Sequence, residues 1–257
     1  MVRISGGAVM TPYRKVQAIK NLEVASVCNL ACPYCPARLQ GEHRETGLMT
    51  EETFERSLYW LSRFVKAGTQ QELNLFGVGE PLLHPKIMEM AAAVRRIMPR
   101  YLSLRMNTNG LLATEEVLRG LLDAGIDAID LTDHEAEAST RTLRLFRKLK
   151  VSFPDVKFGY SRDGIINPNN WGGLIDWVPE VDHPRFLCPW IANGQVMIMS
   201  TGDVTRCCQD AFGRGILGTV HDDLEQLDHT PYIQCLTCHE EIPPGIPKPK
   251  AEKAVIA

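Results

Sequence analysis

The chain contains the stretch Cys28-Asn29-Leu30-Ala31-Cys32-Pro33-Tyr34-Cys35, whose three cysteines have the spacing C-x3-C-x2-C. Three thiolates can hold a four-iron cluster by three of its irons and leave the fourth iron without a protein ligand. An open metal position is also what separates catalytic from structural zinc sites. The alternative is part of a zinc site, but the nearest further ligand, His43, comes eight residues after Cys35 in a polar stretch. The spacing therefore favours a cluster with one open iron.

Length and composition are those of an ordinary globular protein. The chain has 257 residues, of which 44% are hydrophobic and 23% charged, and its net charge of −3 gives no electrostatic reason to expect nucleic acid or an anionic membrane as partner. No apolar run approaches the ~20 residues that span a bilayer, and residues 1–11 lack the apolar core of a signal peptide. We therefore expect a cytoplasmic protein, and eight cysteines in a reducing compartment favour metal binding over disulfides.

Strand and helix patterns alternate between about residues 20 and 165, which predicts βαβ units and a parallel sheet. Thr50 and Thr114 each precede two glutamates and an apolar run at helical spacing, so each is expected to cap a helix. The expected strands cover 21–27, 72–76, 102–106, 128–131 and 156–160, and the expected helices cover 51–67, 87–98, 114–124 and 139–150.

Polar clusters follow three of these strands, where loops at the carboxyl ends of a parallel sheet carry chemistry. They are Gly77-Val78-Gly79-Glu80-Pro81, Thr108-Asn109-Gly110 and Thr132-Asp133-His134. Glycines allow a backbone to approach a ligand closely. Each cluster is also compatible with an ordinary turn or helix cap, so their common position carries more weight than any one of them.

The cysteine spacing, followed by Gly79-Glu80-Pro81 after the next strand, resembles the signature of the radical S-adenosylmethionine (SAM) enzymes. The resemblance implies a partial (β/α) TIM-type barrel, a [4Fe-4S] cluster on Cys28, Cys32 and Cys35, and SAM on the open iron. It also implies that SAM is cleaved to a 5'-deoxyadenosyl radical. The cofactor-binding residues it suggests are Tyr34, Gly77, Gly79, Glu80, Thr108, Asn109, Asp133 and His134.

A second cysteine set lies near the C-terminus, where a hairpin is expected with strands at 195–199 and 204–206. The set resembles the shortened auxiliary-cluster domain, called twitch, of SPASM/twitch radical SAM enzymes. That resemblance implies a second [4Fe-4S] cluster on Cys188, Cys207, Cys235 and Cys238. A zinc site on the same residues is the alternative. The expected organisation is a barrel over 20–165, a twitch domain over 166–240 and a flexible tail over 241–257.

Within that subfamily, residues 20–240 are most similar to the 2-deoxy-scyllo-inosamine dehydrogenase group. Shared features are a glutamate five residues before the first cysteine, Glu45-Thr46-Gly47, the Gly-Glu-Pro-Leu-Leu run, Asp133-His134 and the Asn170-x-Gly-Gly loop. Two residues depart from the group. Trp171 stands where those enzymes have a substrate-contacting arginine, and Gln209 stands where they have a glutamate, so the same substrate is in question.

The resemblance implies hydrogen abstraction from a hydroxyl-bearing carbon of a sugar or aminocyclitol and its oxidation to a ketone. The implied partners are this small molecule and an electron donor such as flavodoxin or ferredoxin. One alternative is a redox-neutral epimerase in which Cys208 returns a hydrogen atom to the substrate. Others are a radical peptide maturase, disfavoured by the short segment before the first strand, and a zinc-binding interaction protein.

Overall fold

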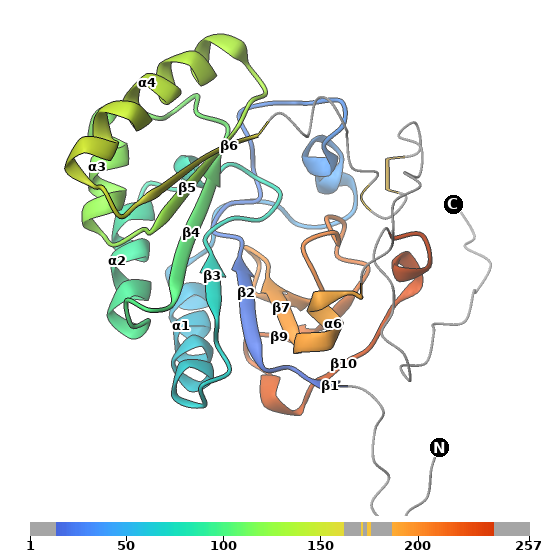
Figure 1. The fold of residues 1–257 in the computed structure, drawn as a ribbon. Coiled ribbons are helices and arrows are strands. Elements are labelled where there is room, and N and C mark those ends of the chain that lie inside the picture. Colours follow the sequence, from blue (N-terminus) through green and yellow to red (C-terminus); the bar gives the residue numbers. More distant parts are fainter. Residues whose placement is uncertain (1–13, 162–170, 172–173, 176–186, 239–257) are drawn as a thin grey trace, which may run out of the picture.

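The computed structural model describes residues 14–161, 171, 174–175 and 187–238 (Figure 1). The expected tail at 241–257 and most of the Asn170-x-Gly-Gly loop lie outside these residues. Within the described residues, no helix is long and apolar enough to cross a membrane.

The central feature is an eight-stranded sheet in the order β6-β5-β4-β3-β2-β7-β8-β9. The six strands from β6 to β7 are parallel to their neighbours, and β8 and β9 continue the sheet antiparallel. The predicted parallel α/β fold is therefore confirmed. The strands are β2 (Ala18–Leu22), β3 (Glu72–Asn74), β4 (Ser103–Thr108), β5 (Ala128–Thr132), β6 (Lys157–Ser161), β7 (Gln195–Ile198), β8 (Asp203–Thr205) and β9 (Ile216–Thr219).

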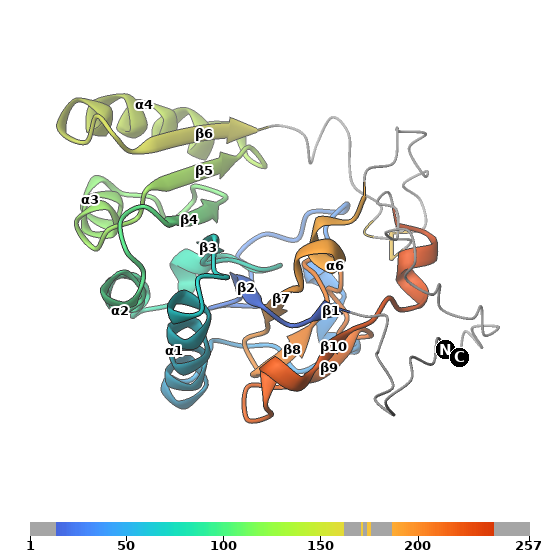
Figure 2. The same cartoon turned by 60° about the horizontal axis from the view of Figure 1, so that its bottom comes forward.

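Four helices cover one face of this sheet (Figure 1, Figure 2). The threonine side chains expected as caps accept hydrogen bonds from backbone amides three residues on, Thr50 from Thr53 and Thr114 from Val117. Each cap satisfies an amide that the first helical turn leaves without a partner. The helices are α1 (Glu51–Lys66), α2 (Ile87–Ile97), α3 (Glu115–Asp123) and α4 (Ala136–Ser152).

Short elements complete the described chain. A two-stranded antiparallel sheet joins β1 (Arg14–Lys15) to β10 (Asp228–His229), near the two ends of the described chain. Helix α6 (Pro189–Asn193) leads into β7. The 3-10 helices are η1 (Pro36–Arg38), η2 (Gln40–Glu42), η3 (Pro81–Leu83), η4 (Leu224–Gln226) and η5 (Ile233–Leu236).

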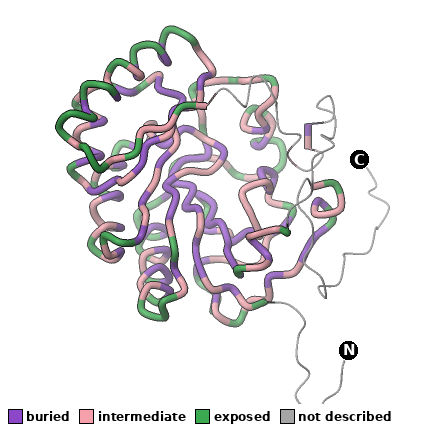
Figure 3. The backbone as a smooth tube through the Cα atoms, in the orientation of Figure 1, coloured by how far each residue is buried: buried purple, intermediate pink, exposed green. Residues whose placement is uncertain are grey.

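The main hydrophobic core lies between the helices and the sheet. Alternate residues of β4, such as Leu104 and Met106, are fully buried, and the helices contribute Phe64, Val94 and Leu118. Figure 3 shows buried backbone concentrated along the central strands and exposed backbone on the outer sides of the helices. This packing fixes the strand ends, and therefore the loops that follow them.

The first parallel strand was expected at 21–27, but β2 spans Ala18–Leu22. After Leu22 the chain leaves the ladder and forms an isolated antiparallel bridge between Ala25 and Leu48. Residues 23–27 therefore lead the chain from the end of β2 to the first cysteine. Their backbone groups form hydrogen bonds with other loops.

The predicted C-terminal hairpin is present as β7 and β8, which pair antiparallel. Strand β7 also pairs in parallel with β2, with Ile19 opposite Val196 and Leu22 opposite Ile198. The second cysteine set is thus attached to the same sheet as the first.

Candidate active site

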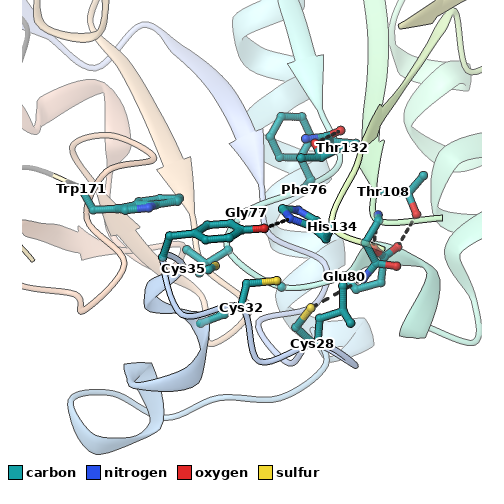
Figure 4. Close-up of a pocket in the computed structure, with 17 residues that line it drawn as sticks. Cys28, Cys32, Cys35, Phe76, Gly77, Glu80, Thr108, Thr132, His134 and Trp171 are labelled. Carbon is teal, nitrogen blue, oxygen red and sulfur yellow. Dashed lines mark hydrogen bonds between the residues drawn. The ribbon is translucent and has the colours of Figure 1, made fainter. Parts of the chain in front are cut away.

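A cavity of about 240 Å³ lies at the carboxyl ends of the parallel strands (Figure 4). The structure brings most of the predicted site residues together around it. Those that line the cavity are Cys28, Cys32, Tyr34, Cys35, Gly77, Gly79, Glu80, Thr108, Asn109, Thr132 and His134. The loops after β3, β4 and β5 therefore meet the cysteine loop, as their position in the sequence predicted.

The cysteine loop leaves all three thiols partly exposed. The amide of Cys35 donates a hydrogen bond to the carbonyl of Cys32 at 3.1 Å, and η1 begins directly after Cys35. Burial raises the pKa of Cys35 to about 11 and also raises the pKa of Cys28. Such thiols stay protonated on their own, whereas a bound metal deprotonates them. The donor set therefore fits a metal group better than free reactive thiols.

The glycines of the Gly77–Glu80 loop are needed for packing against the chain itself. A Cβ atom at Gly79 would lie 2.4 Å from the carbonyl oxygen of Ala25, and one at Gly77 would lie 2.5 Å from Cγ of Glu23. The amide of Glu80 donates to the carbonyl of Val27 at 2.9 Å. The loop thus lies directly on the segment that carries the first cysteine, and any side chain at Gly79 would separate the two.

Glu80 is 2% exposed and uses both carboxylate oxygens within the protein. One oxygen accepts from Thr108 Oγ1 at 2.8 Å and from the amide of Leu82 at 3.0 Å, and the other accepts from the amide of Asn109 at 2.8 Å. Burial raises the pKa of Glu80, and these hydrogen bonds oppose that effect. Glu80 thus joins the loops after β3 and β4. Its predicted contact with SAM stays a prediction.

Two further contacts tie the strand-end loops to the cysteine loop. Asn109 Nδ2 donates to Asn29 Oδ1 at 2.8 Å and lies 3.8 Å from Cys28 Sγ. On the other side of the cavity, Tyr34 Oη lies 2.7 Å from His134 Nδ1, and the two rings are stacked with centroids 5.7 Å apart. These contacts therefore hold the cysteine loop against the loops that follow β4 and β5.

Asp133 and Cys208 do not line this cavity. The Asp133 carboxylate is buried and accepts hydrogen bonds from Ser139 Oγ and Tyr160 Oη at 2.7 and 2.6 Å. Cys208 packs in a separate cluster with Trp190, Met197 and Met199. The cofactor contact of Asp133 and the hydrogen-donor role of Cys208 stay predictions, and the structure brings neither side chain to the cavity.

A buried ion pair next to the Gly77–Glu80 loop was not predicted from the sequence. Glu23 and Arg44 form two hydrogen bonds of 2.8 and 2.9 Å, and their side chains are 0% and 7% exposed. Glu23 also accepts from the amides of Val78 and Ser200, and Arg44 donates to the carbonyl of Ala211. The pair therefore joins the segment before Cys28 to the Gly77–Glu80 loop and to the C-terminal segment. Only the spacing of Glu23 before Cys28 hinted at it.

Trp171 and Phe76 supply aromatic walls to the cavity. Trp171 has φ = 54°, the left-handed region that L-residues other than glycine rarely adopt. Its carbonyl accepts a hydrogen bond of 2.6 Å from Gln234 Nε2, which helps to hold this conformation. Figure 4 shows the indole on the same side of the cavity as Cys35. The tryptophan noted in the sequence as a departure thus lies at the cavity itself.

The second cysteine set surrounds a much smaller cavity of about 20 Å³, lined by Cys188, Trp190, Ile191, Arg206, Cys207, His229, Cys235 and Cys238. Burial raises the pKa of Cys235 to about 11 and that of Cys207 well above its usual value. Arg206 is pinned beside them by hydrogen bonds to the carbonyls of Thr230, Gly215 and Ile216. The four predicted ligands therefore line one cavity, and Cys208 does not line it.

Within the described residues, no three Cys, His, Asp or Glu side chains lie close enough together to hold a single metal ion. The cysteines of each set are instead spread around a cavity.

A parallel α/β sheet with three cysteines on the loop after its first parallel strand, beside a cavity formed by strand-end loops, defines a class of cluster-dependent enzymes. The family model of the Radical SAM superfamily matches residues 22–155, more than half of the chain, and the chain belongs to this superfamily. The family implies SAM and a [4Fe-4S] cluster. Cys28, Cys32 and Cys35 are the residues that would hold the cluster.

The chain is similar over most of its length to the S-adenosyl-L-methionine-dependent 2-deoxy-scyllo-inosamine dehydrogenase of Niallia circulans. They are 25% identical over 206 residues, which are 80% of this chain and 79% of that protein. A crystal structure of BtrN in complex with AdoMet and 2-DOIA matches with a TM-score of 0.65 at 23% identity, covering 82% of this chain and 85% of the other, a likeness of fold. The tungsten-containing aldehyde ferredoxin oxidoreductase cofactor-modifying protein of Pyrococcus furiosus is 34% identical over 42% of this chain and 28% of its own length.

Proposed function

We propose that this protein is a radical SAM dehydrogenase that oxidises a hydroxyl-bearing carbon of a sugar or aminocyclitol to a ketone. The observation that carries the proposal is the second set of cysteines, because a cluster there would receive the electron that such an oxidation releases. Similarity to a dehydrogenase over 80% of the chain supports the same reaction. The proposed cofactors are two [4Fe-4S] clusters and SAM.

Different residues of the chain are proposed to bind the cluster and to contact SAM or substrate. Cys28, Cys32 and Cys35 would hold the SAM-binding cluster, and Tyr34, Thr108 and Asn109 are placed at the cavity to contact SAM or substrate. When bound, the cluster and SAM together supply a 5'-deoxyadenosyl radical, which removes a hydrogen atom from carbon. Phe76 and Trp171 line the cavity and would offer apolar aromatic surfaces to a ring substrate.

The second set would hold the auxiliary cluster through Cys188, Cys207, Cys235 and Cys238. All four line one small cavity, and four cysteines satisfy the irons of a cubane without a further ligand. We propose residues 166–240 as the twitch domain that carries it. A flavodoxin or ferredoxin would reduce the SAM-binding cluster for each new cycle.

The epimerase alternative requires a hydrogen donor at the substrate. Cys208 packs against Trp190, Met197 and Met199 and does not line the cavity at the first cysteine set. This position does not favour a donor role, so dehydrogenation is the function we adopt.

The test is anaerobic reconstitution followed by metal analysis and assay with 2-deoxy-scyllo-inosamine and related cyclitols and sugars. The proposal expects about eight irons per chain, from two four-iron clusters, SAM-dependent formation of 5'-deoxyadenosine, and a ketone product. Product that keeps the hydroxyl and gains one deuterium from D₂O at the reacting carbon would contradict dehydrogenation and indicate epimerisation. Zinc in place of iron would contradict both.

A further inference from the structure

The contact between His134 and Tyr34 places an imidazole at the cavity with one ring nitrogen already engaged. His134 directly follows Asp133 after β5, and its Nδ1 lies 2.7 Å from Tyr34 Oη across the cavity (Figure 4). The rings stack at an interplanar angle of 27°. Among the described residues, the other nitrogen, Nε2, has no hydrogen-bond partner. The imidazole is thus oriented by one nitrogen and available to a ligand through the other.

We propose that His134 accepts, through Nε2, the hydroxyl proton of the substrate as its carbon is oxidised, with Tyr34 as the residue that positions the imidazole. The assignment rests on the dehydrogenase function proposed above. It requires the tautomer in which Nδ1–H donates to Tyr34 Oη, because that tautomer leaves a lone pair on Nε2.

Oxidation of a carbinol to a ketone releases a hydrogen atom from carbon, a proton from the hydroxyl and one electron. The hydrogen atom goes to the 5'-deoxyadenosyl group derived from SAM, and the proton goes to His134 Nε2. The electron goes to a one-electron acceptor, for which the proposed auxiliary cluster is the candidate. The C–H and O–H bonds break and a C=O π bond forms, so the atoms and electrons balance.

His134 is the group at the cavity best suited to take that proton. The other titratable side chains that line the cavity are the three cysteines, Tyr34 and Glu80. Both oxygens of Glu80 already accept hydrogen bonds from the protein, and the thiolates are assigned to the cluster. Asp133, the charged neighbour on the same loop, points to Ser139 and Tyr160.

The surroundings of His134 favour the neutral ring. Burial lowers the pKa of His134, and the nearby Asp133 carboxylate opposes this only in part. A neutral imidazole near pH 7 is the form that accepts a proton. The rate of ketone formation should therefore fall as pH decreases through the pKa of His134, because the protonated ring cannot accept another proton.

The test compares His134→Gln with His43→Gln, whose ring stacks on Phe212 and does not line the cavity. Both are reconstituted and given 2-deoxy-scyllo-inosamine deuterated at its hydroxyl-bearing carbons. For His134→Gln we expect unchanged SAM affinity, continued transfer of deuterium into 5'-deoxyadenosine, and ketone formation reduced about 100-fold. The acidic limb of the pH profile should disappear. His43→Gln should match the wild type in all four measurements.

Tyr34→Phe gives a second, milder variant that keeps the aromatic ring. Loss of the positioning hydrogen bond should lower ketone formation about 5- to 10-fold while the acidic limb remains. A parallel loss of SAM affinity and of deuterium transfer in His134→Gln would overturn the assignment and make His134 a cofactor ligand. Full ketone formation with an intact acidic limb would overturn it as well.

Failure of the wider proposal would look different. A wild-type protein that cleaves SAM but forms no ketone from any of the cyclitols and sugars contradicts the dehydrogenase function, and the assignment of His134 falls with it. A wild type that forms ketone beside an equally active His134→Gln variant contradicts only the assignment of His134.

Discussion

The two cysteine-lined cavities of this molecule differ in how much room they leave. The cavity at Cys28, Cys32 and Cys35 has a volume of about 240 Å³ and is lined by three strand-end loops as well as by the cysteine loop. The cavity among Cys188, Cys207, Cys235 and Cys238 has about 20 Å³ and is also lined by Trp190, Ile191 and Arg206. Three ligands leave one iron open to a second molecule, and four ligands suit a cluster that only exchanges electrons.

The same difference separates catalytic from structural zinc sites, in which an open position marks the catalytic site. Here one sheet carries both arrangements, since β2 leads to the first cysteine set and β7, its parallel neighbour, follows the first cysteine of the second. The Glu23–Arg44 pair contacts both the Gly77–Glu80 loop, which lines the first cavity, and Ala211, which follows Cys207 in the chain. The predictions below test whether the two sites are distinct, and then what joins them.

Disruption of the first cysteine set, Cys28, Cys32 and Cys35, should have the largest effect on activity. In Cys32→Ala we expect SAM cleavage to fall to background and iron to fall from about eight to about four per chain, because a cubane with two cysteine ligands is not retained. Iron analysis and chromatographic detection of 5'-deoxyadenosine check this. Cys208→Ala is the matched control and should keep all of its iron, so an equal loss in both variants would contradict the distinction.

Loss of the second cysteine set should stop formation of the ketone without stopping cleavage of SAM. Cys235→Ala should also retain about four irons, yet it should still form 5'-deoxyadenosine, since the SAM-binding site is intact. Ketone formation should stop for lack of the electron acceptor. If Cys235→Ala loses SAM cleavage as fully as Cys32→Ala, the two sites are not independent.

Loss of the buried Glu23–Arg44 ion pair should lower the stability of the fold. Arg44→Met leaves the Glu23 carboxylate buried without its partner, which costs about 3–5 kcal/mol. The thermal unfolding midpoint should fall by roughly 10 °C, measured by differential scanning fluorimetry. Arg105→Met breaks the more exposed pair of Arg105 with Asp130, and should lower the midpoint by no more than about 4 °C. Equal effects of the two variants would show that burial of the Glu23–Arg44 pair is unimportant.

The smallest effect is expected from a residue that lines neither cavity. Thr114→Ala removes the side-chain cap of α3, which stabilises the protein by about 1 kcal/mol, or about 2–4 °C in the unfolding midpoint. Iron content and SAM cleavage should not change. Any loss of iron in this variant would mean that the strand-end loops depend on helix α3.

Local patterns in the sequence predicted much of this molecule. The spacing of Cys28, Cys32 and Cys35, the strand–helix alternation and the β7–β8 hairpin each depend on neighbouring residues. The first strand was predicted to begin at Asn21, three residues after the start of β2. In the fold its side chain is buried and bonds to Asn74 and to the carbonyl of Phe76 on the adjoining strand and loop.

Contacts between distant segments were not predictable in the same way. Nothing in the sequence distinguishes Arg44 from other arginines, because its partners come from Glu23 and from Ala211, which lies 167 residues away. The pairing of β1 with β10 has no local signature either. At the site, Asp133 stood in a loop at the expected strand end, but only the fold reveals that it turns to Ser139 and Tyr160.

The contrast between the two cysteine sites is tested most directly by electron paramagnetic resonance. The spectra are recorded on the reduced, reconstituted protein with and without SAM. We expect two [4Fe-4S]⁺ signals, of which the one lost in Cys32→Ala shifts when SAM is added and the one lost in Cys235→Ala does not. A single signal, or a SAM-induced shift of the signal that depends on Cys235, would contradict the account.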